Sequence, residues 1–131
     1  LRLFLESCKV KPKLGGVFKS IRSNEKVELE AAFSESKIWA AVKEIDGNKA
    51  LGPDGFNLLC FQKCWKVFKV EMVQFFNDFH CNGRLAKCLT SSFVTLITKK
   101  DCTSGLADFR PINLIGPVYK ILSKVLVHRL K

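Results

Sequence analysis

Three cationic side chains in the last third of this sequence are its best candidates for binding phosphate. Lys99 and Lys100 follow an apolar run at 91–98, and Arg110 stands near the start of a second run at 109–114. If the two runs pair as a β-hairpin, the cations come close to one another. Arginine presents a planar fork of N–H donors that suits phosphate, and lysine presents a point charge. The cations could therefore bind a triphosphate or a nucleic-acid backbone. The alternative is that they are solvated side chains at a hairpin tip and bind no ligand.

No catalytic centre is recognisable among the other polar residues. The two histidines, His80 and His128, lie outside any triad or metal-binding motif, and the sequence has no D-D or D-x-D pair to hold two Mg²⁺ ions. The phosphate loop G-x-x-x-x-G-K-S/T is also missing. The sequence therefore predicts no catalytic and no metal-binding residue in this chain.

The six cysteines allow more than one interpretation. Their even number would permit disulfides in a secreted domain, and Cys60 and Cys64 with His80 and Cys81 would permit a zinc site. No C-x-x-C pair exists, however, and Cys60 and Cys64 lie within an apolar helical pattern. Nothing in the sequence is typical of secretion. We interpret the cysteines as thiols of a reducing intracellular compartment, the nucleus or the cytoplasm.

The composition indicates one basic domain with an aromatic core. The chain has 131 residues, a formal net charge of +10 and eleven phenylalanines, and 47% of its residues are hydrophobic. This apolar content argues against disorder, and no apolar run reaches the roughly 18 residues that span a membrane. Residues 84–131 carry nine Lys and Arg against two Asp. That excess favours a polyanionic partner such as nucleic acid and a solvated basic surface about equally.

A glycine-rich turn is predicted at 49–56, where the sequence reads Lys-Ala-Leu-Gly-Pro-Asp-Gly-Phe. Gly52, Pro53, Asp54 and Gly55 are incompatible with a helix or a central strand. Pro53 fixes one backbone angle, and Gly55 is able to take a positive φ. A turn needs one of these glycines, so the second one indicates a stretch of backbone that something approaches closely. A simple connector is the alternative.

Hydrophobic spacing predicts helices on either side of this turn. Ser34 fits an N-cap, and the apolar side chains that follow repeat as one helical face until Asp46-Gly47. After the turn, a stripe of large side chains runs to an Asn82-Gly83 cap signal. The stripe predicts one long helix, or two helices with a break near Lys69. The first face consists of Ile38, Ala41, Val42 and Ile45, and the stripe of Leu58, Phe61, Trp65, Phe68, Met72, Phe75 and Phe79.

The last third of the chain predicts a hairpin and a helix. Residues 91–98 are rich in β-branched and aromatic side chains, and 109–114 form the expected returning strand, with Pro111 at an edge or a bulge. Gly116-Pro117 opens a final helix, because proline is favoured at the first helical position. Its inner face is apolar and its outer face basic, with Val118, Ile121, Leu122 and Val125 inside and Lys120, Lys124 and Lys131 outside.

The order helix, turn, long helix, hairpin, helix is an α+β arrangement. Residues 1–30 show little pattern, and we interpret them as a lead-in or linker to a domain at 31–131. Within the lead-in, residues 9–16 are typical of a basic loop, and 23–30 of a short helix or a tether.

Four motifs, in this order, resemble the reverse transcriptases of non-LTR retrotransposons, and the plant LINE-type elements in particular. The first is the turn at 49–56, and the second is Thr-Leu-Ile-Thr-Lys-Lys at 95–100. The third is Asp-Phe-Arg-Pro-Ile-Asn-Leu-Ile at 108–115. The fourth combines Tyr-Lys-Ile-Leu at 119–122 with Arg-Leu-Lys at 129–131.

The resemblance covers residues 31–131 and implies a part of an RNA-directed DNA polymerase. This chain would hold the incomplete fingers, and the start of the palm, of a right-hand polymerase. Lys99 and Arg110 match the family's contacts to the triphosphate of the incoming deoxynucleotide. The turn would lie near the template through Lys49, Gly52, Pro53, Asp54 and Gly55. The implied partners of the intact enzyme are an RNA template, a DNA primer and a deoxynucleotide, and its implied cofactor is Mg²⁺.

The sequence departs from the family pattern at several positions. Leu51, Thr98 and Thr103 stand where the family usually has proline, and Asn113 where it has serine. Lost prolines relax fixed backbone angles, so we hypothesise a decaying copy of an element. The family's metal-binding aspartates follow the last helix seen here, and the chain stops at Lys131 before them. We therefore expect a truncated fragment that is inactive alone; a non-catalytic nucleic-acid-binding remnant and a decayed reading frame without function are the alternatives.

Overall fold

The structure is a computed structural model that describes residues 15–16 and 20–131. The predicted basic loop around Lys9, Lys11 and Lys13 lies outside the described residues, apart from Gly15 and Gly16. The described elements are, in order, α1 (Ser23–Glu30), α2 (Glu35–Glu44), α3 (Leu58–Lys63), α4 (Trp65–Asn82), α5 (Lys87–Thr90), β1 (Ser92–Thr98), the 3-10 helix η2 (Leu106–Asp108), β2 (Phe109–Ile115) and α6 (Pro117–Leu130).

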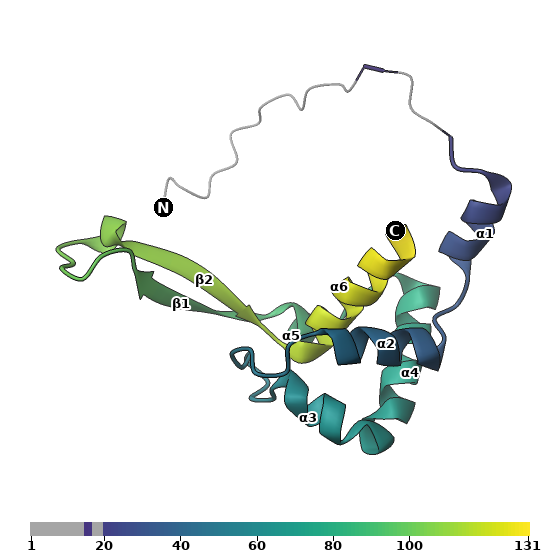
Figure 1. The fold of residues 1–131 in the computed structure, drawn as a ribbon, viewed down its shortest axis with the longest axis horizontal. Coiled ribbons are helices and arrows are strands. Elements are labelled where there is room, and N and C mark those ends of the chain that lie inside the picture. The colour runs from purple at the N-terminus through teal and green to yellow at the C-terminus, as the bar shows by residue number, and fades with distance from the viewer. Residues whose placement is uncertain (1–14, 17–19) are drawn as a thin grey trace.

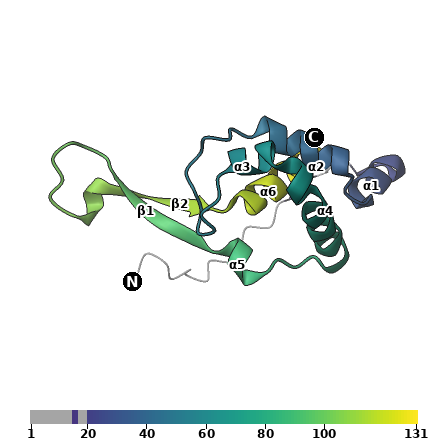
Figure 2. The same ribbon diagram turned by 90° about the horizontal axis from the view of Figure 1, so that it is seen from below.

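A helical body carries a β-hairpin that projects away from it (Figure 1, with the view from below in Figure 2). The core lies within the helical body, where α2, α3, α4 and α6 bury their apolar faces together. Strand β1 is exposed along its whole length, so it adds nothing to this core. The buried core residues are Phe33, Ile38, Ala41, Val42, Leu58, Phe61, Trp65, Met72, Phe76, Ile121, Leu122 and Val125.

Helix α2 begins where its sequence predicts. The Ser34 hydroxyl accepts a hydrogen bond from the backbone N–H of Lys37 at 3.4 Å, which satisfies one free donor of the first turn. The predicted face is buried at Ile38, Ala41 and Val42. The helix ends before Asp46, whose carboxylate accepts from the N–H of Asn48 at 3.0 Å. The N-cap and apolar-face predictions for this helix are therefore confirmed.

The stripe after the turn forms two helices, and the predicted break near Lys69 is wrong. The break falls at Cys64, where the backbone leaves helical angles at φ −102° and ψ 25°. Within α4, the buried residues are Trp65 and Met72, which belong to the predicted stripe, and Phe76. Phe76 is fully buried although it was not part of the predicted stripe. The members Phe68, Phe75 and Phe79 are half-buried at the border of the core.

Two local signals set boundaries as predicted, and a third segment settles between two open alternatives. Gly83 takes the left-handed conformation at φ +63° and donates its N–H to the Phe79 carbonyl at 2.8 Å, which ends α4. Pro117 occupies the first turn of α6. The residues at 23–30, for which a helix and a tether were both open, form α1.

Helix α6 is tied to α2 by a small ionic cluster. The Glu44 carboxylate accepts from Lys124 Nζ at 2.8 Å and lies 2.9 Å from Nε2 of His128. The hydrogen bond from Lys124, assisted by His128, lowers the pKa of Glu44. Lys124, expected on an outer basic face, thus lies half-buried at the joint between the two helices, paired with Glu44. In the described part of the chain, no helix is both long and apolar enough to cross a membrane.

Candidate nucleic-acid interface

The β-hairpin is an antiparallel pair with an unbroken register. Ile97 lies opposite Arg110, and Leu96 lies opposite Pro111. Because side chains alternate between the faces of a strand, Ile97 and Arg110 share one face and Leu96 and Pro111 the other. Pro111 has no N–H to donate, and a two-stranded sheet places it at an edge, as predicted. The cations of this region are therefore carried on a protruding two-stranded ribbon.

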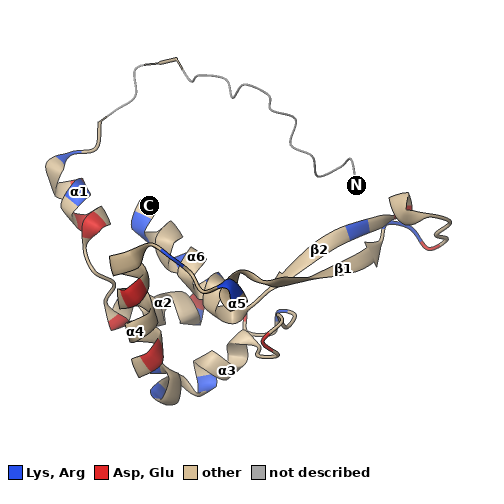
Figure 3. Ribbon diagram, turned by 180° about the vertical axis from the view of Figure 1, so that it is seen from behind, with Lys and Arg blue, Asp and Glu red and all other residues tan. Residues whose placement is uncertain are grey.

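The hairpin exposes apolar side chains on both faces. Phe93 is 57% exposed and Val94 is 63% exposed. Leu96, Ile97 and Ile112 are also exposed. Figure 3 shows a basic segment on β2 and another just after β1, with acidic residues beside the second one in the loop that joins the strands. The hairpin thus combines positive charge with apolar surface, a combination that suits contact with both the phosphates and the bases of a nucleic acid.

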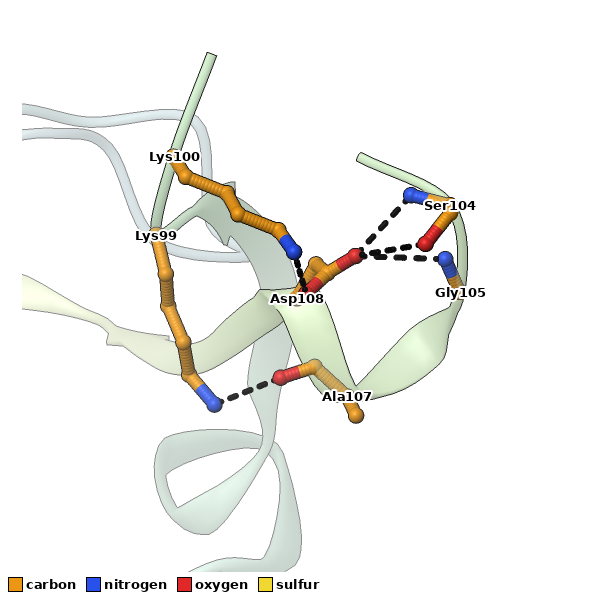
Figure 4. Close-up of polar contacts among 6 residues, drawn as sticks. All are labelled: Lys99, Lys100, Ser104, Gly105, Ala107 and Asp108. Atoms are coloured by element: carbon orange, nitrogen blue, oxygen red, sulfur yellow. Dashed lines mark hydrogen bonds and ion pairs between the residues drawn. The ribbon is translucent and has the colours of Figure 1, made fainter. Parts of the chain in front are cut away.

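The two lysines that follow β1 are held by their own loop (Figure 4). Lys99 Nζ donates to the Ala107 carbonyl at 2.7 Å, and Lys100 Nζ forms an ion pair with Asp108 Oδ1 at 2.8 Å. The Lys99 backbone N–H donates to the Asp108 carbonyl at 2.8 Å, which extends the ladder past the end of β1. Lys99 and Arg110 are therefore diagonal neighbours on one face, with Cβ atoms roughly 7–8 Å apart.

Both cations of the predicted pair are exposed, and Arg110 is the one without a polar side-chain contact to another described residue. Its side chain makes no hydrogen bond and no ion pair with another described residue, whereas Lys99 and Lys100 are both engaged. The structure therefore brings Lys99 and Arg110 together as the sequence predicts, and Arg110 is the one whose donors face solvent. No signal in the sequence indicated the loop contacts of the lysines.

Asp108 organises the loop that joins the strands. Its Oδ2 accepts from the backbone N–H of Ser104 at 2.9 Å and of Gly105 at 3.4 Å (Figure 4). The ion pair with Lys100, followed by the bond from the Ser104 N–H, lowers the pKa of Asp108. The pKa of Asp108 is lower in the folded state than in the unfolded chain, where it is near 4. The ionised carboxylate therefore stabilises the loop above about pH 4, and this stabilisation is lost as the pH falls through the folded-state pKa.

Replacing Asp108 with asparagine is expected to loosen this loop without unfolding the helical body. The amide keeps one acceptor oxygen but loses the charge that holds Lys100. The protection of the Ser104 and Gly105 amides against hydrogen exchange, relative to the intrinsic rate at the same pH, should fall, and the unmodified chain should lose the same protection as the pH falls through the lowered pKa of Asp108. Asp101→Asn on the same loop is the control. Unchanged exchange in Asp108→Asn would contradict the assigned contacts.

The glycine-rich turn takes the predicted form. The Gly55 N–H donates to the Gly52 carbonyl at 3.1 Å, and Gly55 has φ +72°. The Asp54 carboxylate accepts from the N–H of Phe56 at 3.3 Å, which fixes the residue after the turn. Gly52 is buried and Pro53 half-buried, while Lys49, Asp54 and Gly55 are exposed.

The close approach that the second glycine indicates is present at Gly52. A Cβ atom at this position would lie 2.5 Å from the backbone N of Gly116 and 2.7 Å from the carbonyl carbon of Ile115. A Cβ atom at Gly116 would lie 2.7 Å from the Asp54 carboxylate, a side-chain group that is able to move. The turn is therefore packed, backbone against backbone, on the junction between β2 and α6.

A groove of about 550 Å³ joins the turn to the last helix. Lys49 lines it together with Lys120 and Lys124 of α6. Lys120 Nζ donates to the Ala50 carbonyl at 3.2 Å, so it too is engaged rather than free on an outer face. This contact spans 70 residues of sequence, and no sequence pattern predicted it. The structure thus brings Lys49 together with α6 and keeps it apart from the hairpin tip.

The described residues do not fit the Mg²⁺ that the resemblance implies for an intact polymerase. Among residues 15–16 and 20–131, no three His, Cys, Asp or Glu side chains gather as a metal site requires. Two carboxylates of the candidate interface, Asp54 and Asp108, are occupied by turn and loop contacts. No metal-dependent step is therefore assigned to these residues.

Comparison with known proteins connects the chain to a mobile element. No protein-family model matches the sequence. The chain is similar to the uncharacterized 149 kDa protein of transposon TX1 from Xenopus laevis, with 24% identity over 111 residues. The matched residues are 85% of this chain and 8% of the relative, so the chain spans a small part of that protein's length. The similarity indicates a retrotransposon-related protein.

Proposed function

We propose that this chain is a part of the RNA-directed DNA polymerase of a LINE-type retrotransposon, from the fingers and the start of the palm. In this proposal Arg110 and Lys99 contact the triphosphate of the incoming deoxynucleotide. The turn that contains Gly52 lies near the RNA template. In this proposal, carboxylates outside the described residues hold the Mg²⁺ ions of the intact enzyme.

The packing of Gly52 on Gly116 is the observation that supports this proposal most. It holds the turn motif against the end of the hairpin motif, although the two glycines are far apart in the sequence. The hairpin then projects from this junction and carries Arg110 with its donors free among the described residues. A backbone contact of this kind fixes the distance between the turn and the base of the hairpin. An enzyme that positions a template and a nucleotide requires such a fixed distance between the segments that bind them.

The similarity to a transposon protein adds independent support. It extends over 85% of the chain and so covers most of the motif region rather than a single motif. The activity and partners of the whole protein remain part of the proposal.

Replacing Arg110 with alanine tests the proposed phosphate contact. We expect affinity for a fluorescent deoxynucleoside triphosphate to fall roughly tenfold, because the change removes charge-assisted hydrogen bonds. The measurement is fluorescence anisotropy of the labelled nucleotide. Arg84→Ala is the matched control, since Arg84 is exposed in the turn after α4 and lies outside the hairpin. Equal losses in the two variants would contradict the proposal.

Labelled single-stranded RNA in the same assay separates the proposal from a non-catalytic nucleic-acid-binding module. Each phosphate contact of a single strand contributes about 0.7 to the slope of log affinity against log salt concentration. If Arg110→Ala lowers this slope but leaves triphosphate binding unchanged, the hairpin contacts a nucleic-acid backbone and the nucleotide assignment is wrong. Loss of triphosphate binding with an unchanged RNA slope supports the assignment.

A further inference from the structure

Strand β1 has a free outer edge within the described part of the chain. The sheet formed by the described residues consists of β1 and β2, so each strand is paired on one side. All seven residues of β1, Ser92–Thr98, are exposed. The segment reads Ser-Phe-Val-Thr-Leu-Ile-Thr and contains no charge, no proline and no glycine. An exposed, uncharged edge that is rich in β-branched and aromatic residues is a template for pairing with a further strand.

The register shows which backbone groups of β1 point to this free edge. The N–H of Lys99 donates to the Asp108 carbonyl at 2.8 Å, so the groups of Lys99 point toward β2. Along a strand, the N–H and C=O of successive residues point alternately to the two sides. No backbone hydrogen bond from another described element reaches the outer side. The residues whose backbone groups point outward are therefore Ser92, Val94, Leu96 and Thr98.

The outer edge of β2 is blocked by Pro111. Pro111 lies opposite Leu96, whose backbone groups point away from β2. The two residues are therefore a non-hydrogen-bonded pair, and the N–H that proline lacks is missing from the outer side of β2. A proline on an edge strand prevents the pairing of a further strand. The hairpin thus has one open edge, which is that of β1.

The sequence of β1 is complementary to itself in an antiparallel pair. A two-fold axis at Thr95, perpendicular to the sheet, places the outward groups of Val94 opposite those of Leu96 of a second copy. In this register Phe93 lies opposite Ile97 of the second copy, and Thr95 lies opposite the second Thr95. Aromatic side chains opposite β-branched ones, and threonine opposite threonine, are cross-strand pairs that stabilise a sheet.

This register also keeps the positive charges of the two copies apart, although each chain has a net charge of +10. The lysine nearest to the segment is Lys99, four residues beyond Thr95. At about 3.4 Å per residue, the two copies of Lys99 are separated by roughly 27 Å along the strands. Charges at that distance are screened, because the Debye length is about 8 Å at physiological salt. The charge pattern of the chain is therefore compatible with a second copy at this edge.

We propose that two copies of this chain pair through β1 and form a continuous four-stranded sheet with a β2 strand at each outer edge. The proposal does not depend on the proposed polymerase function. Pro111 blocks both outer edges, so the association stops at a two-fold symmetric dimer. Edge pairing leaves both faces of the sheet open, so the buried area stays below the roughly 1,200–2,000 Å² of a stable interface. The dimer is therefore weak, with a dissociation constant in the micromolar range.

The dimer brings the cations of the two hairpins onto one surface. Arg110 shares a face of the hairpin with Ile97 and Phe93, because Ile97 is its partner on β1. Since Ile97 meets Phe93 of the second copy on that same face, both copies of Arg110 lie on one side of the four-stranded sheet. The opposite face has no charged residue along β1 or β2.

Sedimentation velocity of the full chain across the micromolar range tests this dimer. We expect a concentration-dependent exchange between monomer and dimer. Thr95→Lys and Thr95→Glu should each weaken the dimer roughly tenfold, because like charges then lie directly opposite each other. An equimolar mixture of these two variants should regain the dimer, because lysine then lies opposite glutamate. Asn113→Lys is the matched control, since Asn113 is an exposed residue of β2, and it should leave the dimer intact.

Four results would overturn the proposal. The first is a monomer throughout the concentration range, and the second is a dimer that Thr95→Lys weakens no more than Asn113→Lys does. The third is a species larger than a dimer, which would mean that the edge of β2 is open. The fourth is a mixture of Thr95→Lys and Thr95→Glu that stays monomeric, which would exclude the two-fold register at Thr95. None of these results bears on triphosphate binding by Arg110, so a failure of the dimer and a failure of the proposed function are distinguishable.

Discussion

Phe76→Ala is expected to lower the free energy of unfolding by about 3–5 kcal/mol, the largest loss from any single change considered for this chain. Phe76 is fully buried in the middle of α4. Its ring packs edge-on against Phe33 at 5.2 Å and against Phe75 at 5.5 Å between ring centres. Truncation removes these aromatic contacts and leaves a cavity that the surrounding helices only partly close.

The measurement is urea unfolding followed by circular dichroism. The free energy of unfolding of a small domain is about 5–15 kcal/mol. Phe76→Ala should therefore lower the urea concentration at the midpoint of unfolding strongly, or abolish the folded state. Val70→Ala is the matched control, because Val70 lies on the same helix and is 55% exposed. That variant should stay within about 0.5 kcal/mol of the unmodified chain. If the two variants lose the same stability, the position of Phe76 in the core is wrong.

Gly52→Ala is expected to be the second most damaging change, at about 1–3 kcal/mol or more. The new methyl group would lie 2.5 Å from the Gly116 nitrogen and 2.6 Å from its Cα, and these backbone atoms cannot rotate away as a side chain does. To relieve the overlap, the turn must separate from the junction of β2 and α6. We therefore expect a loss of nucleic-acid affinity together with the loss of stability.

Two other glycines provide graded controls for Gly52→Ala. Gly116→Ala meets the Asp54 carboxylate at 2.7 Å, a side-chain group that can move, so its cost should be smaller. Gly105→Ala meets nothing within 4 Å and has an extended φ of −162°, so it should be close to neutral. Urea unfolding of the three variants should rank them in this order. A Gly105→Ala loss as large as that of Gly52→Ala would contradict the backbone contact.

Local signals in the sequence predicted most of the helix and strand boundaries. The Ser34 cap, the Asn82-Gly83 end and the Gly116-Pro117 start each act within one helical turn, so a short window of sequence contains their whole cause. The hairpin was predictable for a similar reason, because alternation and β-branched residues mark both of its strands.

The errors arose where distant residues decide the outcome. The apolar spacing continues through Cys64 without interruption, so periodicity gave no indication of the break there or of the burial of Phe76. Lys120 and Lys124 are polar and were expected on an outer face, but their partners Ala50 and Glu44 come from earlier parts of the chain.

The sequence predicted which residues form the candidate interface, but it did not predict which groups their side chains contact. Lys99 and Arg110 lie on one hairpin face, as pairing of the two apolar runs requires. That Lys100 is neutralised by Asp108 depends on the shape of the loop between them, which the sequence does not specify. Only the structure therefore shows that the donors of Arg110 are free among the described residues, whereas those of Lys99 and Lys100 already have partners.

The contact between Gly52 and Gly116 also sets an order of events during synthesis of the chain. The turn cannot reach its final packing until residue 116 has been made, 64 residues after residue 52. At about 5–20 residues per second, that delay on a ribosome is roughly 3–13 s. Helices α2, α3 and α4 are all made before α6, so their apolar faces lack the cover of Ile121, Leu122 and Val125 until α6 is synthesised. The nascent polypeptide is therefore most exposed to chaperones and proteases in the seconds before its last helix emerges.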